Sequence, residues 1–112
     1  MSCQLRWSPA ALEDLDSIWS DVLEASGDVV TADRFVAGLR EAVSGKKEFP
    51  MSGTPLLFMG VFTGIRYVRF KRYIAFCRVR GDVLEVSRVL FEASDYMKPL
   101  FGLPSGESTP DG

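Results

Sequence analysis

The sequence of 112 residues contains no histidine and only two cysteines, Cys3 and Cys77. The missing histidine excludes His-based general acid–base catalysis, Ser-His-Asp and Cys-His nucleophile pairs, and histidine-ligated metal sites. Two cysteines that are far apart in the sequence do not form a zinc site, and they fit a reducing compartment in which both stay thiols. We therefore expect no metal and no cofactor. Cys77 lies among apolar residues, which predicts an inert buried thiol.

Long apolar runs are missing as well. The longest stretch without a charged residue, Phe49–Ile65, is interrupted by prolines and glycines. It is too short for a bilayer span, which needs about 20 apolar residues. No apolar leader precedes Trp7, so we expect a cytoplasmic protein that does not contact membranes. The length predicts one domain over residues 1–102, and residues 103–112 have the composition of a disordered tail.

Charge is distributed unevenly along the chain. Residues 1–48 hold five Lys or Arg against nine Asp or Glu, whereas residues 65–90 hold seven against two. A basic segment of this kind suits contact with nucleic acid or with an acidic protein surface. The alternative is that the acidic and basic segments neutralise each other in the folded domain.

Two helices are predicted in the first half of the chain. Ser8-Pro9 has the pattern of a helix start, in which serine caps and proline takes the first helical position. Apolar residues then recur at helical spacing as far as Ser26-Gly27: Leu12, Leu15, Ile18, Trp19, Val22 and Leu23. A second amphipathic helix is predicted to begin within residues 28–31 and to end before Pro50. The short link makes the two helices an antiparallel hairpin, with Trp19 expected in the core.

Strands are predicted on both sides of this hairpin. Gln4–Trp7 alternates polar and apolar residues, which favours a short opening strand. Ile65–Phe70, Tyr73–Val79 and Val83–Leu90 are rich in β-branched and aromatic residues, and their short links join antiparallel neighbours. The order β-α-α-β-β-β predicts an α+β domain in which the helical hairpin packs on a small, mostly antiparallel sheet. Ser94–Phe101 has room for a short C-terminal helix.

Several short motifs together resemble the RelE/ParE family of bacterial type II toxins. They are Ser8-Pro9-Ala10-Ala11, Asp14–Trp19, Phe49-Pro50-x-x-Gly53, Gly64-Ile65-Arg66, Tyr73–Val79 and Arg88-Val89-Leu90. The resemblance extends from Ser8 to Gly102, and its first and last motifs are more like the ParE branch. It implies a toxin that a cognate, ParD-like antitoxin neutralises. The RelE branch cuts mRNA in the ribosome, and the ParE branch is associated with poisoning of DNA gyrase.

The chemistry of RNA cutting separates the two branches. Attack by a 2′-hydroxyl needs a base, an acid and cations around one phosphate. RelE-type enzymes place an arginine directly after a strand tyrosine, where this chain has Tyr73-Ile74, and another after the last strand, where it has Phe91-Glu92-Ala93-Ser94. The pattern therefore favours a protein that acts by binding over an enzyme. If the chain is an endonuclease, its catalytic candidates are Arg66, Arg72, Arg78 and Tyr96.

Two groups of residues are candidates for protein contacts. Binding to the target is assigned to a basic turn and to the C-terminal segment: Arg69, Lys71, Arg72, Tyr96, Met97 and Phe101. Binding to the antitoxin is assigned to an apolar cluster in a loop broken by glycine and proline: Leu57, Phe58, Met59, Val61 and Phe62. This loop either folds back on the core or forms a groove that an antitoxin helix or strand covers. Arg66 and Arg78 have a structural alternative, an ion pair with a carboxylate such as Asp14 or Asp16 of the first helix, and this alternative is favoured for Arg78.

Three hypotheses of function follow. The first is a ParE-like toxin that binds DNA gyrase. The second is a ribosome-dependent mRNA endonuclease of the RelE type. The third is a degenerate relative that still binds an antitoxin and harms no target.

Overall fold

The computed structural model describes residues 3–93 and 99–100. The elements follow one another as β1 (Gln4–Trp7), α1 (Pro9–Ser26), α2 (Val29–Ser44), the short 3₁₀ helices η1 (Gly45–Lys47) and η2 (Pro50–Ser52), β2 (Thr54–Phe58), β3 (Val61–Phe70), β4 (Tyr73–Arg80) and β5 (Val83–Phe91). This is the predicted α+β order with one additional strand, β2. The expected C-terminal helix and tail lie outside the described residues, apart from Pro99 and Leu100.

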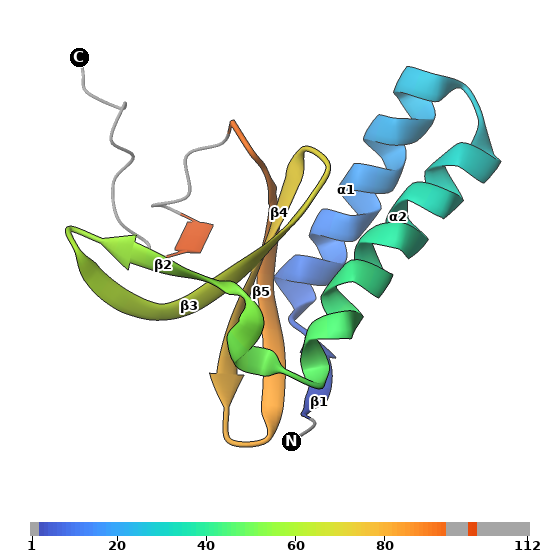
Figure 1. The fold of residues 1–112 in the computed structure, drawn as a ribbon. Coiled ribbons are helices and arrows are strands. Elements are labelled where there is room, and N and C mark those ends of the chain that lie inside the picture. The colour runs from blue at the N-terminus through green and yellow to red at the C-terminus, as the bar shows by residue number, and fades with distance from the viewer. Residues whose placement is uncertain (1–2, 94–98, 101–112) are drawn as a thin grey trace, which may run out of the picture.

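The five strands form one sheet in the order β1-β5-β4-β3-β2. β1 runs parallel to β5, and every other neighbouring pair is antiparallel. The helices α1 and α2 lie side by side as an antiparallel hairpin against one face of the sheet (Figure 1). Within the described part of the chain, neither helix combines the length and the apolar composition of a membrane span.

The start of α1 is fixed by the predicted cap. The Ser8 hydroxyl accepts a hydrogen bond from the Ala11 N–H at 3.0 Å and donates one to the Ser87 carbonyl at 2.7 Å. Pro9 takes the first helical position, and Gly27 ends the helix in the left-handed conformation with φ 70°. Because Ser8 also bonds to β5, the cap positions the helix along the sheet as well as starting it.

The second helix is capped by Asp28. The Asp28 carboxylate accepts hydrogen bonds from the Val30 N–H and from the Thr31 hydroxyl. The Thr31 bond is the largest of the causes that lower the pKa of Asp28. The prediction of a buried Trp19 is wrong: its ring is half-buried, and the indole N–H donates to Asp33 at 2.8 Å. Trp19 therefore links α1 to α2 near the outside of the hairpin.

Apolar residues pack on both faces of the sheet. The larger cluster lies between the sheet and the helices and is centred on Ala11, Leu15, Ile18, Leu39, Val43, Ala75, Cys77, Leu84, Val86 and Val89. A smaller cluster, Ile65, Ile74 and Phe76, covers the opposite face with Leu56, Tyr67, Leu90 and Leu100. The strands therefore have a helix-facing side and an outer side, and neighbouring residues of one strand belong to different sides.

Candidate functional site

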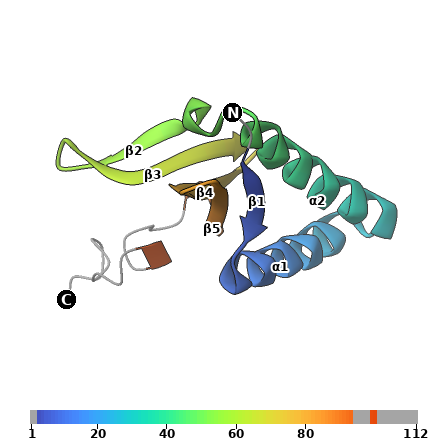
Figure 2. The same cartoon turned by 90° about the horizontal axis from the view of Figure 1, so that it is seen from below.

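The strands β2 and β3 form an arm that extends away from the helices (Figures 1 and 2). Met59 and Gly60 make its two-residue turn, with φ values of 55° and 81°. Positive φ at both turn residues matches the twist of a hairpin. The prediction of an irregular loop over Leu57–Phe62 is therefore wrong. The glycines and prolines obscured the strand, because they lie at its turn, at a bulge and on an edge strand, where a hairpin tolerates them.

The tip of this arm carries five exposed apolar side chains that are close together in the chain. The exposed fractions are Leu57 56%, Phe58 43%, Met59 86%, Val61 68% and Phe62 46%. These five residues are the predicted antitoxin-binding cluster, and the hairpin places them at its tip. Leu57 and Phe62 are paired on one face of the hairpin and Phe58 and Val61 on the other, so the tip exposes apolar side chains on both faces, which is typical of an interaction site.

A bulge shapes the arm where it joins the sheet. The register of β2 against β3 shifts between Pro55 and Leu57. In the bulge the Thr63 hydroxyl donates to the Leu56 carbonyl at 2.7 Å and accepts from the Ile65 N–H at 3.2 Å. Gly64 has φ 86°, a conformation that favours glycine. Since a bulge increases strand twist, it turns the tip relative to the rest of the sheet.

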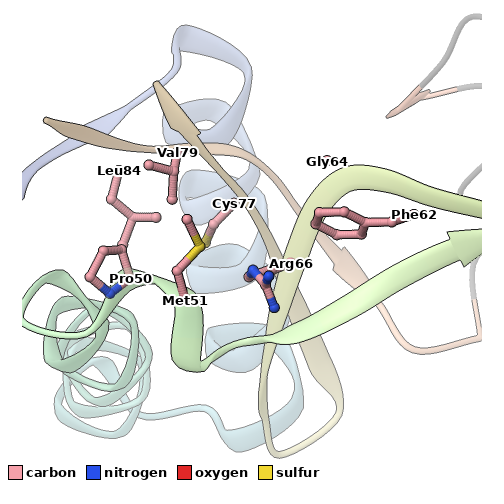
Figure 3. A pocket seen from close by; sticks show the side chains of 8 residues that line it. All are labelled: Pro50, Met51, Phe62, Gly64, Arg66, Cys77, Val79 and Leu84. Atoms are coloured by element: carbon pink, nitrogen blue, oxygen red, sulfur yellow. The ribbon is translucent and has the colours of Figure 1, made fainter. Parts of the chain in front are cut away.

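A cavity lies at the base of this arm on the helix-facing side of the sheet (Figure 3). Its volume is about 230 Å³, and its lining is Pro50, Met51, Phe62, Gly64, Arg66, Cys77, Val79 and Leu84. Apart from Arg66, these side chains are apolar or weakly polar. Burial raises the pKa of the Cys77 thiol to about 12. Cys77 is therefore the buried thiol that its position predicted, and it forms part of the cavity wall.

Arg66 is the cation of this cavity. Its Nη1 donates to the Gly53 carbonyl at 3.3 Å, and its guanidinium carbon lies 5.0 Å from the centre of the Phe62 ring. In Figure 3, Met51 and Cys77 lie on one side of the guanidinium and Phe62 on the other. Among the described residues, no carboxylate forms an ion pair with Arg66.

Arg78 lies on the other side of the sheet from Arg66. In the β3–β4 register, Arg66 is opposite Cys77 of the helix-facing cluster, whereas Arg78 is opposite Ile65 of the outer cluster. Directly opposite residues share a face, so the two arginines point to opposite sides. The Nε of Arg78 is buried without a hydrogen-bond partner, and within the described chain no carboxylate pairs with Arg78.

The predicted ion pair with the first helix exists, but it belongs to a different arginine. Arg88 binds the Asp14 carboxylate through both Nε and Nη2, at 2.7 and 2.9 Å. The Asp14 carboxylate also accepts the Val89 N–H at 2.9 Å. This hydrogen bonding raises the pKa of Arg88. The expectation for Arg78 is therefore wrong, because α1 lies along β5 and reaches Arg88 rather than a residue of β4.

The basic turn between β3 and β4 gathers the other predicted cations. Lys71 and Arg72 are exposed at the turn, and the Lys71 ammonium lies 5.5 Å from the centre of the Phe70 ring. Arg69 forms an ion pair with Glu92. Beside the turn, burial and the charge of Asp21 raise the pKa of Tyr73. The other predicted contact residues, Tyr96, Met97 and Phe101, lie outside the described residues.

Comparison with known protein families identifies the family of this chain. Residues 5–96 match the family model of the ParE toxin of the type II toxin-antitoxin system, parDE. The chain belongs to this family. The resemblance to RelE/ParE toxins inferred from the motifs is thereby confirmed, and the protein is a type II toxin of the ParE/RelE superfamily.

Solved structures show the same fold as this ParE-family chain. The chromosomal ParDE system from P. aeruginosa is 22% identical with a TM-score of 0.69, over 80% of this chain and 96% of that chain. The toxin-antitoxin complex RelBE2 from Mycobacterium tuberculosis is 19% identical with a TM-score of 0.61, over 84% and 95%. The chain matches none of the curated proteins.

Two features of this ParE-family site were not predicted from the sequence. Met51 and Pro50 belong to η2 and form one wall of the cavity. Their proximity to Cys77 and Leu84 depends on the path of the chain after α2, which no local pattern encodes. The signal that was present is the Phe49-Pro50-x-x-Gly53 motif, since Gly53 is the residue whose carbonyl accepts from Arg66.

Proposed function

We propose that this ParE-family toxin acts by binding DNA gyrase, and that it does not cut RNA. The observation that carries the proposal is the divergence of the candidate catalytic arginines. Arg66 belongs to the helix-facing side, Arg78 to the outer side, and Arg72 to the β3–β4 turn. They do not converge on a common point where a phosphate would lie.

RNA cleavage requires that several catalytic groups converge on one phosphate. A base, an acid and a stabilising cation have to act on the same phosphate, within hydrogen-bond reach of the reacting atoms. A binding protein has no such geometric requirement, so the arrangement of the described residues supports binding over cleavage.

The antitoxin is the second part of the proposal. The two similar solved structures are a ParDE toxin-antitoxin system and a RelBE2 toxin-antitoxin complex. By likeness to them, the protein has a cognate, ParD-like antitoxin. The antitoxin covers the tip of the arm, Leu57, Phe58, Met59, Val61 and Phe62, because this apolar surface is large and exposed.

The gyrase-binding surface is assigned to the basic turn with Arg69, Lys71 and Arg72, together with the segment that contains Tyr96, Met97 and Phe101. The turn has the opposite charge to the acidic first half of the chain, residues 1–48. Gyrase works on DNA, so an acidic helix surface is repelled from the complex and a basic turn is attracted.

The test measures gyrase inhibition and mRNA cleavage with the same protein preparation. Purified protein is added to a gyrase supercoiling assay and, separately, to ribosomes programmed with mRNA. We expect inhibition of supercoiling and intact mRNA. The double variant Lys71→Glu/Arg72→Glu should need about tenfold more protein for the same inhibition, and Lys46→Glu/Lys47→Glu is the matched control at η1. Codon-positioned mRNA cleavage that Arg66→Ala abolishes would overturn the proposal, as would the absence of any effect on gyrase.

A further inference from the structure

The cavity at the base of the arm has the size of a side chain. Its volume of about 230 Å³ is below the roughly 300–1,000 Å³ of typical small-molecule sites. One wall, Met51, is 61% exposed, and another, Phe62, is 46% exposed. An apolar group entering between them would bury surface that the free protein leaves in water.

Arg66 makes this cavity selective for charge. Residues 49–81 contain six Lys or Arg and no Asp or Glu. The described contacts of the Arg66 guanidinium are a neutral carbonyl and an aromatic ring. Both leave donors of the planar guanidinium fork available, and such a fork favours a carboxylate that binds it bidentately. The complement to this part of the molecule is therefore an acidic group next to an apolar one.

We propose that this cavity is the anchor site for the antitoxin, which inserts one apolar side chain beside Met51 and Phe62 and pairs a neighbouring carboxylate with Arg66. This inference rests on the proposed antitoxin partner and specifies how that partner is recognised. The apolar anchor supplies burial, and the carboxylate supplies orientation.

A second copy of this chain that docks arm against arm does not offer the required acidic group. A symmetric dimer buries the same surface patch on both partners. Arm against arm would bring Arg66 near its own counterpart, with no carboxylate between residues 49 and 81 of either copy. Like charges so placed oppose association.

The last described residue, Leu100, lies on the side of the sheet opposite to this cavity. Leu100, at the end of the described chain, packs against Ile65, Ile74 and Phe76 of the outer cluster. The cavity opens on the opposite, helix-facing side, where Cys77 and Leu84 line it. A separate chain remains as the occupant.

The experiment uses this protein co-expressed with the antitoxin from the same operon, and the readout is the affinity of the purified pair. Arg66→Gln removes the cation, Arg66→Lys keeps the charge without the planar fork, and Met51→Trp fills the cavity. Arg34→Gln and Val30→Trp are matched controls on α2, where both residues are exposed. Circular dichroism verifies that every variant is folded.

We expect Arg66→Gln and Met51→Trp each to weaken the complex about tenfold or more, with Arg66→Lys intermediate and both controls within about twofold. Neutralising the antitoxin's carboxylates one at a time should identify one whose loss is not additive with Arg66→Gln. Unchanged affinities, or additive losses for every carboxylate, overturn the anchor site but leave the antitoxin partner standing.

Three other outcomes also decide the question. If the unmodified protein forms no complex, the proposed function and the anchor site both fall. If Met51→Trp dissociates a dimer of this chain, the occupant is a second copy. If deletion of residues 101–112 strengthens the complex more than about tenfold, the chain's own C-terminus occupies the cavity. The last two results overturn the anchor site.

Discussion

The two edges of the sheet differ in how their backbone hydrogen-bonding groups are satisfied: one edge is formed by β1 beside β5, and the other by β2. Beyond β1, the edge of β5 is closed by polar groups at the start of α1: Ser8 bonds to Val86 and Ser87, and Asp14 accepts the Val89 N–H. At the other edge, β2 has no neighbouring strand in the described chain. Phe58 and Val61 flank a two-residue turn, which makes them a hydrogen-bonded pair, so the N–H and C=O of Leu57 point away from β3.

This difference separates stability from binding. At the β5 edge, backbone groups are satisfied within the chain, and the polar contacts join residues more than 70 positions apart. The β2 edge and its arm leave large parts of several apolar side chains exposed to solvent. Edge strands are commonly protected by charges, prolines or bulges; β2 has Pro55 and a bulge beside it, but no charged residue. We propose that the first edge holds the domain together and that the second binds a partner.

The largest expected effect comes from breaking the closed edge. Asp14→Ala removes both hydrogen bonds to Arg88 and leaves the Val89 N–H without its acceptor. We expect the free energy of unfolding to fall by about 3 kcal/mol, measured by urea denaturation. Asp16→Ala, an exposed acid on the same helix, is the control and should change stability by less than about 0.5 kcal/mol. Equal effects at the two positions would refute a special role for the edge.

The opposite pattern is expected at the open edge. The double variant Leu57→Ser/Val61→Ser should leave the free energy of unfolding within about 0.5 kcal/mol of the parent, because both side chains are mostly exposed. Its affinity for the antitoxin should fall about tenfold or more. Val29→Ser/Val30→Ser alters two valines with similar exposure, 52% and 53%, and should not change affinity. Strong destabilisation by the arm variant would assign the arm to the core instead.

The pH dependence of the free energy of unfolding tests whether water is excluded from the Cys77 thiol at the base of the arm. The thiol of Cys77 ionises near pH 9 in the unfolded chain, and burial raises its pKa to about 12 in the folded protein. Between pH 9 and pH 12 the thiol is ionised in the unfolded chain but protonated in the folded protein. The stability that is fully present below pH 9 is therefore lost as the pH rises from 9 to 12. Between pH 8 and pH 10, the protein should therefore lose about 1 kcal/mol more stability than the Cys77→Val variant does. Parallel pH profiles would show a hydrated thiol.

The smallest effect is expected at the tip of the arm. Met59 has φ 55°, a conformation that asparagine tolerates better than methionine. Met59→Asn should therefore raise the free energy of unfolding by about 0.5 kcal/mol, as measured by thermal and urea unfolding. Gly60→Ala, which adds a side chain at φ 81°, should lower it by about 1 kcal/mol. Destabilisation by Met59→Asn would contradict the turn geometry.

Sequence patterns predicted most of the fold because most of its signals are local. The Ser8-Pro9 start, the beginning of the second helix within residues 28–31 and the alternation of Gln4–Trp7 each depend on neighbours in the chain, and the structure confirms all three. The strand β2 was missed because its turn, Met59-Gly60, lacks the usual asparagine or aspartate and because Pro55 interrupts the strand. The glycines and prolines of this segment predicted a loop, but pairing with β3 makes it one strand of a hairpin.

The candidate site depended more on tertiary packing. The five apolar residues of the arm lie around one turn because they are close in sequence. The ion pair of α1 was assigned to Arg78 although Arg88 makes it, because the choice depends on which strand lies beside α1. The register shift between Phe76 and Cys77 has no local signature either. The cavity joins η2 to three strands, and no spacing rule predicts such an arrangement.

Amide hydrogen exchange on the free protein and on its antitoxin complex tests the central claim most directly. The account predicts that exchange slows most across residues 54–62, including the outward-pointing Leu57 amide, while the Val89 amide is slow in both states because Asp14 accepts it. Protection confined to α1, α2 or β1, with residues 54–62 unchanged, would contradict the assignment of the open edge to the partner.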